Sequence, residues 1–274
     1  MQERVFVVTG ANSGVGKGLT LRLAETGGTV IMVCRNRERG EAAQAEIRAQ
    51  SGNQRVDLLI ADLSSMAAVR AVGEEIKGRT PQVDLLINNA AVLKPNREHT
   101  TEGNEIMFAT NHLAPFLLTR LLLESLKASG LGRVLNVTAP STSKLDFGNL
   151  QGERDFNSLN QFGATKMANL LFTFGAARRW QDSGVSVNAI HPGLVQSNLM
   201  REANFLMRLL MSLISWTSPA RAAESIVRVG TGAEYADQTG KFYLNGKETK
   251  ADSYAYDQAV QDGLWQVSAV LTQV

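Results

Sequence analysis

Cysteine, long apolar runs and net charge are all scarce in this sequence. Cys34 is the only cysteine among 274 residues, so no disulfide can form within the chain, and its apolar neighbours predict a buried strand residue rather than a reactive thiol. A net charge of +2 from dispersed charged residues gives no indication of nucleic-acid binding. No stretch reaches the roughly 18 apolar residues of a membrane span. No signal peptide is recognised either, so we expect a cytoplasmic protein.

Short β-branched runs alternate with longer helical patterns along the whole chain. The predicted strands are 4–9, 29–34, 56–62, 83–89, 132–138, 185–191 and 241–245. Helices are predicted at 16–26, 38–50 and 65–77, in a long region that ends near Ser129, and at 162–181, 219–230 and the C-terminus. Apolar strands joined by helices predict an α/β fold with a Rossmann-type, doubly wound parallel sheet. No repeat or low-complexity linker interrupts the pattern, so residues 1–274 are predicted to form a single domain.

A glycine-rich turn follows the first predicted strand. The stretch TGANSGVGKG lies between that strand and the next helix. Residues without a Cβ let backbone N–H groups approach a pyrophosphate at a helix N-terminus, so the stretch predicts a dinucleotide-binding turn. The expected contacts are Gly10, Asn12, Ser13, Gly14, Val15 and Gly16.

Two arginines follow the second predicted strand. A dinucleotide-binding protein that prefers NAD would usually carry an acid there, to accept hydrogen bonds from the ribose 2′-hydroxyl. This chain has Arg35 and Arg37, with Asn36 between them. A guanidinium pairs well with a 2′-phosphate, so NADP(H) is the predicted cofactor and Arg35 its main contact. Arg37 has the alternative of a solvated helix start.

Over nearly its whole length the chain resembles the short-chain dehydrogenase/reductase family, and within it the retinol-dehydrogenase-like branch. The motifs that carry the resemblance are TGANSGVGKG (9–18), CRN (34–36), ADLSS (61–65), NNAA (88–91), NHLAPFLLT (111–119), RVLNVT (133–138), TKMANLLF (165–172) and HPGLVQS (191–197). The resemblance implies further cofactor contacts at Asp62, Leu63, Asn89, Ala90, Val137, Lys166, Pro192, Gly193, Val195 and Ser197, and it implies no metal. Ala91 stands where the family usually has a glycine.

Two of the family's catalytic residues are missing at the matching positions. The resemblance places the catalytic asparagine at Asn111 and the lysine at Lys166. Phe162 occupies the position of the tyrosine acid, and Ala139 that of the serine that orients the carbonyl oxygen. Each change removes a hydroxyl and keeps the shape, which fits a natural variant as well as a disabled mutant.

Other side chains are candidates to replace the missing serine and the missing acid. Ser141 and Ser143 follow the fifth predicted strand in a loop, whereas Thr138 is expected to point away because strand side chains alternate. Asp146 and His112 are further candidates. A tyrosine could come from the C-terminal part of the chain, which holds all four of them: Tyr235, Tyr243, Tyr254 and Tyr256.

An apolar, methionine-rich segment at about 198–217 completes the pattern. In the family this region covers the substrate, so we expect a lid over a bulky apolar ligand; a helix packed on the core, or a dimer or membrane-surface contact, is the alternative. The expected function is NADP(H)-dependent oxidation or reduction of a carbonyl/alcohol on an apolar small molecule. A non-redox enzyme such as a cyclase or isomerase, and a catalytically silent NADP(H)-binding protein, stay open. A homodimer or homotetramer is also left open.

Overall fold

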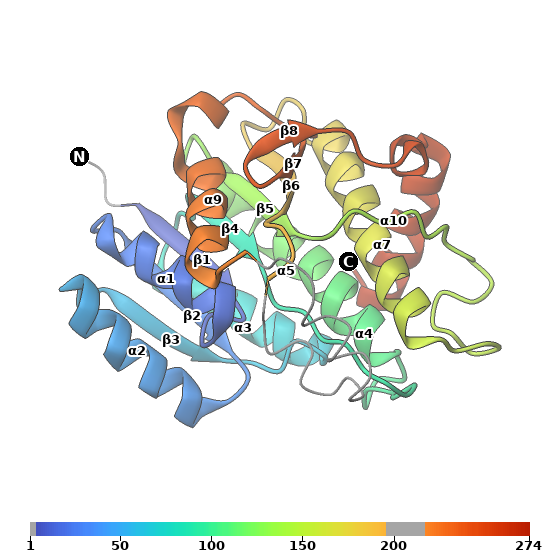
Figure 1. The fold of residues 1–274 in the computed structure, drawn as a ribbon, viewed down its shortest axis with the longest axis horizontal. Coiled ribbons are helices and arrows are strands. Elements are labelled where there is room, and N and C mark those ends of the chain that lie inside the picture. Colours follow the sequence, from blue (N-terminus) through green and yellow to red (C-terminus); the bar gives the residue numbers. More distant parts are fainter. Residues whose placement is uncertain (1–3, 196–216) are drawn as a thin grey trace.

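An eight-stranded sheet forms the centre of the computed structural model, which describes residues 4–195 and 217–274 (Figure 1). The strand order is β3-β2-β1-β4-β5-β6-β7-β8, with β8 alone antiparallel to its neighbour. The strands are β1 (Val5–Thr9), β2 (Thr29–Cys34), β3 (Val56–Ile60), β4 (Leu85–Asn88), β5 (Arg133–Val137), β6 (Ser186–His191), β7 (Phe242–Leu244) and β8 (Lys247–Thr249). The predicted Rossmann-type α/β fold is confirmed.

Helices cover both faces of the sheet (Figure 1). One face carries α1 (Gly14–Glu25), α2 (Arg37–Ser51) and α9 (Pro219–Thr231), and the other carries α3 (Met66–Arg79), α5 (Ala114–Leu121), α7 (Ser158–Arg179) and α10 (Gln258–Thr272). Alternate strand residues supply the two cores. On β1, Val5 and Val7 pack on the α3 and α7 side, and Phe6 and Val8 on the α1 side. Because both faces are covered, the strands are apolar almost without interruption.

The helical region expected to end near Ser129 is not one continuous helix. It consists of α4 (Ile106–Phe108), a π-helical turn η1 (Ala109–Leu113), α5 and α6 (Leu123–Ala128). The widened turn carries Asn111, whose side chain bonds to the backbone of Val92 in the loop after β4. A π-helical turn of this kind frequently marks a functional site.

The C-terminal part adds a hairpin and a covering helix. A strand was expected at 241–245; the structure has β7 there and pairs it with β8 through a turn at Asn245 and Gly246, both with positive φ. Helix α10 then packs against α7. Its Trp265 ring lies 5.0 Å from the Phe116 ring and 5.8 Å from the Trp180 ring, measured between centroids. The chain end therefore closes the α5 and α7 side of the molecule.

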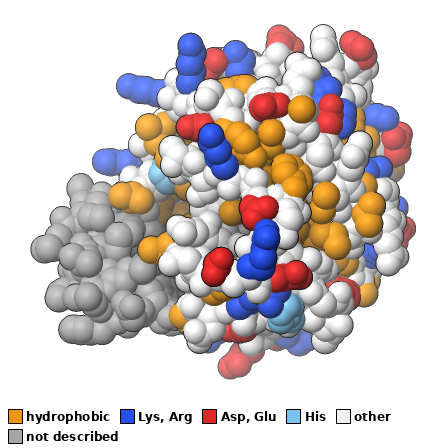
Figure 2. Space-filling view, turned by 90° about the vertical axis from the view of Figure 1, so that its right-hand side faces the viewer, with side chains coloured by type: hydrophobic (Ala, Val, Ile, Leu, Met, Phe, Trp, Pro, Cys, Tyr) orange, Lys and Arg blue, Asp and Glu red, His pale blue; other side chains and the backbone are white. Residues whose placement is uncertain are grey.

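The surface carries charges of both signs. On the face seen in Figure 2, acidic and basic side chains are interspersed, with hydrophobic side chains between them. Cys34 is 2% exposed, and burial raises the pKa of its thiol to about 11, so it is a buried strand residue as predicted. Within 4–195 and 217–274, no helix has the length and apolar character needed to cross a membrane.

Candidate active site

The glycine turn after β1 is tightly folded and leads into an uncapped helix N-terminus. Gly10 and Gly14 have φ values of +66° and +52°, and a Cβ on Gly16 would lie 2.1 Å from the Gly10 carbonyl oxygen. Helix α1 begins at Gly14, and the side chain of its N-cap residue Ser13 makes no hydrogen bond to the helix. The first N–H groups of α1 are thus left without a side-chain cap, as an anion-binding helix N-terminus requires. This part of the chain fits a pyrophosphate.

The end of β4 holds the turn in place. The Asn89 side chain donates to the Thr9 carbonyl oxygen at 2.9 Å, and the backbone N–H groups of Asn89 and Ala90 donate to the Thr9 hydroxyl at 3.0 and 3.1 Å. The Asn89 amide therefore faces the turn. Thr9 was not predicted as a site residue, although it opens the TG motif of the sequence.

The end of β2 presents one guanidinium with no ion-pair partner among the described residues. Arg35 is exposed there. Arg37 instead lies 3.5 Å from the carboxylate of Glu41, and the Asn36 side chain accepts from the Arg39 N–H as the N-cap of α2. Because β1 and β2 are parallel neighbours in register at Thr9 and Val33, Arg35 lies at the same sheet edge as the glycine turn.

Side-chain hydrogen bonds hold the region after β3, and one of the side chains that make them, Glu102, was not predicted from the sequence. Asp62 accepts from the Ser64 backbone and hydroxyl, and Leu63 is buried. Glu102, far away in sequence, accepts from the Ser65 hydroxyl at 3.0 Å and from the N–H groups at the start of α3 at 2.8 and 3.0 Å. It fixes the loop before α4 to the predicted adenine side of the site. No pattern in the neighbouring sequence predicts this contact.

The segment after β6 is held closely by two neighbours. Gly193 has a φ of +87°, and a Cβ there would lie 2.6 Å from the Thr217 hydroxyl oxygen and 2.8 Å from the Asn245 side-chain oxygen. Val195 pairs with Thr217 as an isolated bridge. Pro192 is buried, and Val137, at the end of β5, is half-buried. Ser197 and nearly all of the predicted lid at 198–217 lie outside the described residues.

Asn111 contacts α7 at Thr165, the residue before Lys166. The Asn111 side chain accepts from the Val92 N–H at 2.8 Å and donates to the Val92 carbonyl oxygen at 3.0 Å and the Thr165 hydroxyl at 3.1 Å. Lys166 is 6% exposed, and its Nζ lies 5.1 Å from the centre of the Phe162 ring, one helical turn earlier. Burial lowers the pKa of Lys166 to about 8. Phe162 and Lys166 are thus neighbours on α7, and Asn111 bonds to the same helix at Thr165.

Three hydroxyl groups near Ala139 and Phe162 donate to the backbone of α7, whereas the Ser143 hydroxyl lies beside Gly163 without such a bond in the described part of the chain. Thr138 donates to the Lys166 carbonyl oxygen at 3.0 Å, Ser141 to that of Gly163 at 2.8 Å, and Thr165 to that of Phe162 at 2.8 Å. Ser141 is one of the predicted candidates to replace the missing serine. Its proton is engaged by the helix in this structure.

His112 lies apart from the Lys166 site. Its Nε2 is 2.8 Å from the Ser268 hydroxyl oxygen of α10, and the ring is fully buried among the rings of Phe108, Phe116 and Phe172. Burial lowers its pKa to about 3, although the Asn169 side chain partly opposes the shift. The imidazole is therefore neutral and part of the core.

The four tyrosines also have their hydroxyls engaged. Tyr235 donates to the Gly246 carbonyl oxygen and Tyr243 to the Gln238 side chain, Tyr254 accepts from the Leu145 N–H, and Tyr256 accepts from the Ala251 N–H. None of these partners belongs to the Phe162 and Lys166 face. The structure therefore gives no sign that a C-terminal tyrosine replaces Phe162.

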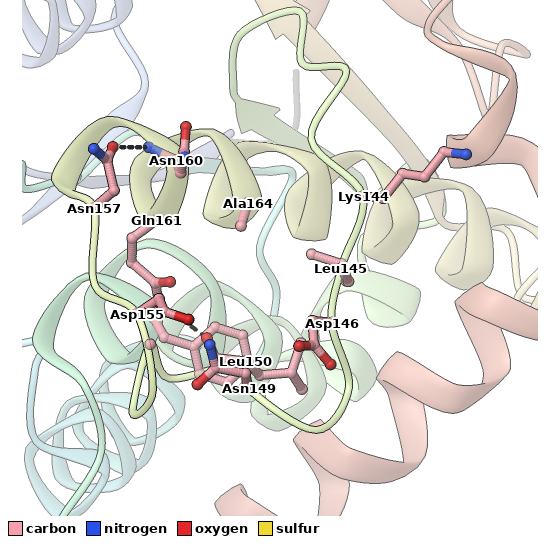
Figure 3. Close-up of a pocket in the computed structure, with 12 residues that line it drawn as sticks. Lys144, Leu145, Asp146, Asn149, Leu150, Asp155, Asn157, Asn160, Gln161 and Ala164 are labelled. Carbon is pink, nitrogen blue, oxygen red and sulfur yellow. Dashed lines mark hydrogen bonds between the residues drawn. The ribbon is translucent and has the colours of Figure 1, made fainter.

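A cavity of about 140 Å³ lies on another side of α7 (Figure 3). Asn160, Gln161 and Ala164 line it from the helix, and the loop that carries Asp146 lines it opposite. At about 100° per residue, positions 160, 161 and 164 point away from positions 162 and 166. Asp146 itself accepts from Arg154 at 2.9 Å and is exposed. This cavity is separate from the Lys166 site, and Asp146 belongs to the cavity.

Comparisons with known proteins agree with this geometry. Residues 4–205 match a family profile described as short chain dehydrogenase. The chain is 38% identical over 272 residues to retinol dehydrogenase 12 of Mus musculus, covering 98% of this chain and 86% of that protein. It is 37% identical over 278 residues to retinol dehydrogenase 13 of Homo sapiens, covering 98% of this chain and 84% of that protein.

Solved structures show the same fold. The structure of an uncharacterized protein from Mycobacterium Paratuberculosis superposes with a TM-score of 0.74 at 28% identity, covering 99% of this chain and 94% of that one. A short-chain dehydrogenase from Sphingobium yanoikuyae, in complex with NADPH, gives a TM-score of 0.71 at 23% identity, with 94% of each chain covered.

Within the described ranges, no group of three or more histidine, cysteine, aspartate or glutamate side chains could hold a metal ion.

Proposed function

Because this chain belongs to the short-chain dehydrogenase family, in its retinol-dehydrogenase-like branch, we propose that it interconverts a carbonyl and an alcohol on a bulky apolar small molecule with NADP(H). One observation carries the choice of cofactor. The end of β2 presents Arg35, which is exposed and has no ion-pair partner among the described residues. A guanidinium there can pair with the 2′-phosphate that distinguishes NADP(H) from NAD(H), whereas the uncapped N-terminus of α1 suits the pyrophosphate that both cofactors carry.

The residues that would hold the cofactor follow the sheet edge. The turn from Gly10 to Gly16 would take the pyrophosphate, Arg35 the 2′-phosphate, and Pro192 to Val195 the nicotinamide amide. When bound, the nicotinamide supplies or accepts a hydride. The contact of Asn111 with Thr165, next to Lys166, supports a catalytic site at the carboxyl ends of the strands, where α/β folds of this kind bind their ligands.

The substrate class rests on two supports. Residues 198–217 are rich in leucine and methionine, as an adaptable apolar binding surface would be. The relatives are named retinol dehydrogenases, and retinol is a bulky apolar alcohol. Neither support identifies the natural substrate, so a panel of apolar aldehydes and ketones of graded size is the appropriate probe.

The test follows cofactor and product together. The purified chain is incubated with NADPH or NADH and each carbonyl, and with NADP⁺ and the matching alcohols. We expect oxidation of NADPH with an equal amount of alcohol formed, and more slowly with NADH. Product without cofactor oxidation would indicate a non-redox enzyme such as a cyclase or isomerase. Tight NADPH binding with no product from any carbonyl would indicate a silent cofactor-binding protein. Either result would overturn the proposal.

A further inference from the structure

Reduction of a carbonyl needs a proton for the oxygen, and the described site offers few sources. The hydroxyls of Thr138, Ser141 and Thr165 donate to carbonyl oxygens of α7 at 2.8 to 3.0 Å. They can reorient, but a hydroxyl of ordinary acidity does not release a proton near neutral pH. Phe162 and Ala139 have no exchangeable proton on their side chains.

His191 is the titratable neighbour of Lys166, but it is not suited to give a proton. Its Nδ1 lies 3.2 Å from the Thr138 carbonyl oxygen, which can only accept, so Nδ1 carries the hydrogen. Burial lowers the pKa of His191, and the positive charge of Lys166 lowers it further, while the Thr138 contact opposes both. The ring is therefore neutral at neutral pH, with an unprotonated Nε2.

Lys166, in contrast to His191, is suited to give a proton. Its side chain is buried, and its Nζ lies 5.1 Å from the centre of the Phe162 ring. Among the described residues no carboxylate pairs with it. Of its described neighbours, Thr138, just after β5, bonds to the Lys166 carbonyl oxygen, Asn111 of η1 bonds to the adjacent Thr165, and His191 at the end of β6 interacts with the Lys166 charge; of these three, His191 alone titrates. Burial lowers the pKa of Lys166 to about 8. Near neutral pH, Lys166 is therefore an ammonium ion in most molecules, and it releases its proton more readily than an ordinary lysine does.

We infer that Lys166 is itself the acid of this site and gives its proton to the substrate oxygen. This role rests on the proposed function. As the carbonyl carbon gains a hydride from the reduced nicotinamide, the electron pair of the C=O π bond moves to the oxygen, which takes a proton from the Lys166 ammonium. The neutral amine then regains a proton from water. In the oxidative direction, the neutral amine accepts the proton of the alcohol.

The test compares Lys166→Arg with Lys144→Arg, a matched change in the loop beside the separate cavity. Arginine keeps the positive charge but does not release a proton, because its pKa lies above about 12. We expect Lys166→Arg to bind NADPH within a few-fold of the parent and to lose about 10²-fold in NADPH oxidation with an accepted carbonyl. Lys144→Arg should keep both. In the parent, the rate of reduction should be level at lower pH and fall about tenfold per unit above about 8, where the acid is deprotonated.

A second readout does not depend on turnover. In protein labelled with ¹³C at the lysine ε-carbons, the resonance that disappears in Lys166→Met should titrate near pH 8. The acid role falls if that resonance titrates near 10, if Lys166→Arg reduces carbonyls at the parent rate, or if the fall of rate at high pH persists in Lys166→Arg. If the parent binds NADPH but reduces no carbonyl, the proposed function falls and the acid role with it. Turnover with an unaltered pH profile in Lys166→Arg removes the acid role alone.

Discussion

At the residue scale, the proposed cofactor and the proposed chemistry each depend on one pair of side chains. Arg35 and Arg37 stand two positions apart, yet the structure gives them different surroundings: Arg37 pairs with Glu41, and Arg35 has no ion-pair partner in the described part of the chain. Phe162 and Lys166 are one helical turn apart, so a ring lies over the ammonium group. The spacing within each pair is read from the sequence, but which side chain of a pair contacts its surroundings is seen only in the structure.

Arg35→Ala should weaken NADPH binding about tenfold to a hundredfold and leave NADH binding nearly unchanged. The guanidinium is expected to make charge-assisted hydrogen bonds to the 2′-phosphate, which NADH lacks. Titration calorimetry with both cofactors measures the difference. Arg37→Ala is the matched control, since its side chain already pairs with Glu41, and it should change neither affinity much. Equal losses for NADPH and NADH in Arg35→Ala would contradict the assignment.

Phe162→Tyr combined with Ala139→Ser should speed NADPH oxidation with an accepted carbonyl by about 10²-fold or more. The new phenol would face the Lys166 ammonium, which lowers the pKa of a neighbouring phenol and makes it a better acid. Steady-state rates are compared with the parent and with each single variant, after calorimetry has shown that NADPH still binds. Because residues that act as a unit are not additive, the single variants should gain much less. A parent that turns over a substrate while the double variant gains nothing would mean that the proton follows another route.

At the scale of elements, the periodicity of apolar residues predicted the regular strands and helices well, but it did not predict the irregular turn or the long-range contacts. Strands β1 to β6 and helices α1, α2, α3 and α9 lie within a few residues of their predicted ranges, because buried parallel strands and amphipathic helices leave clear patterns. The π-helical turn η1 was missed because the extra residue per turn leaves no mark in such a pattern. Glu102 was missed because its partners lie at the start of α3, more than thirty positions away in the sequence.

Glu102→Gln should destabilise the fold by about 1 kcal/mol or less, since solvent screens a partly exposed carboxylate. Burial alone would raise the pKa of Glu102, but the donors at Ala67, Met66 and Ser65 outweigh it, and the pKa is lowered overall. Its contribution is therefore fully present above the ordinary glutamate value and is lost as the pH falls through the lower folded value. The measurement is the free energy of unfolding in urea, for the parent and the variant, at pH 7 and at acid pH. Glu74→Gln, on the exposed side of α3, is the control. Equal effects of the two changes would argue against the cap.

At the scale of the whole molecule, the chain end completes the core. Helix α10 is attached to the middle of the chain through the Trp265 ring against Phe116 and through Ser268 against His112. The sequence predicted a terminal helix but not its partner, because periodicity identifies an apolar face and not the element that it meets. The same long-range contact explains why His112, next to the site residue Asn111 in sequence, turns into the core instead.

His112→Gln should make the folded protein less sensitive to acid. Burial lowers the folded pKa of His112 to about 3, whereas an unfolded histidine has a pKa near about 6.5. Between these values the unfolded chain binds a proton that the folded chain does not, so the free energy of unfolding falls by about 1.4 kcal/mol for each unit of decreasing pH. Glutamine can still bond to Ser268 but does not titrate. Urea unfolding between pH 4 and pH 6 should therefore show a slope smaller by about that amount in His112→Gln, even if loss of the ring lowers its stability at every pH. His99→Gln, at an exposed position, should keep the parent slope. Identical slopes in the parent and His112→Gln would mean that the buried ring takes up its proton without unfolding, and the neutral core histidine would have to be abandoned.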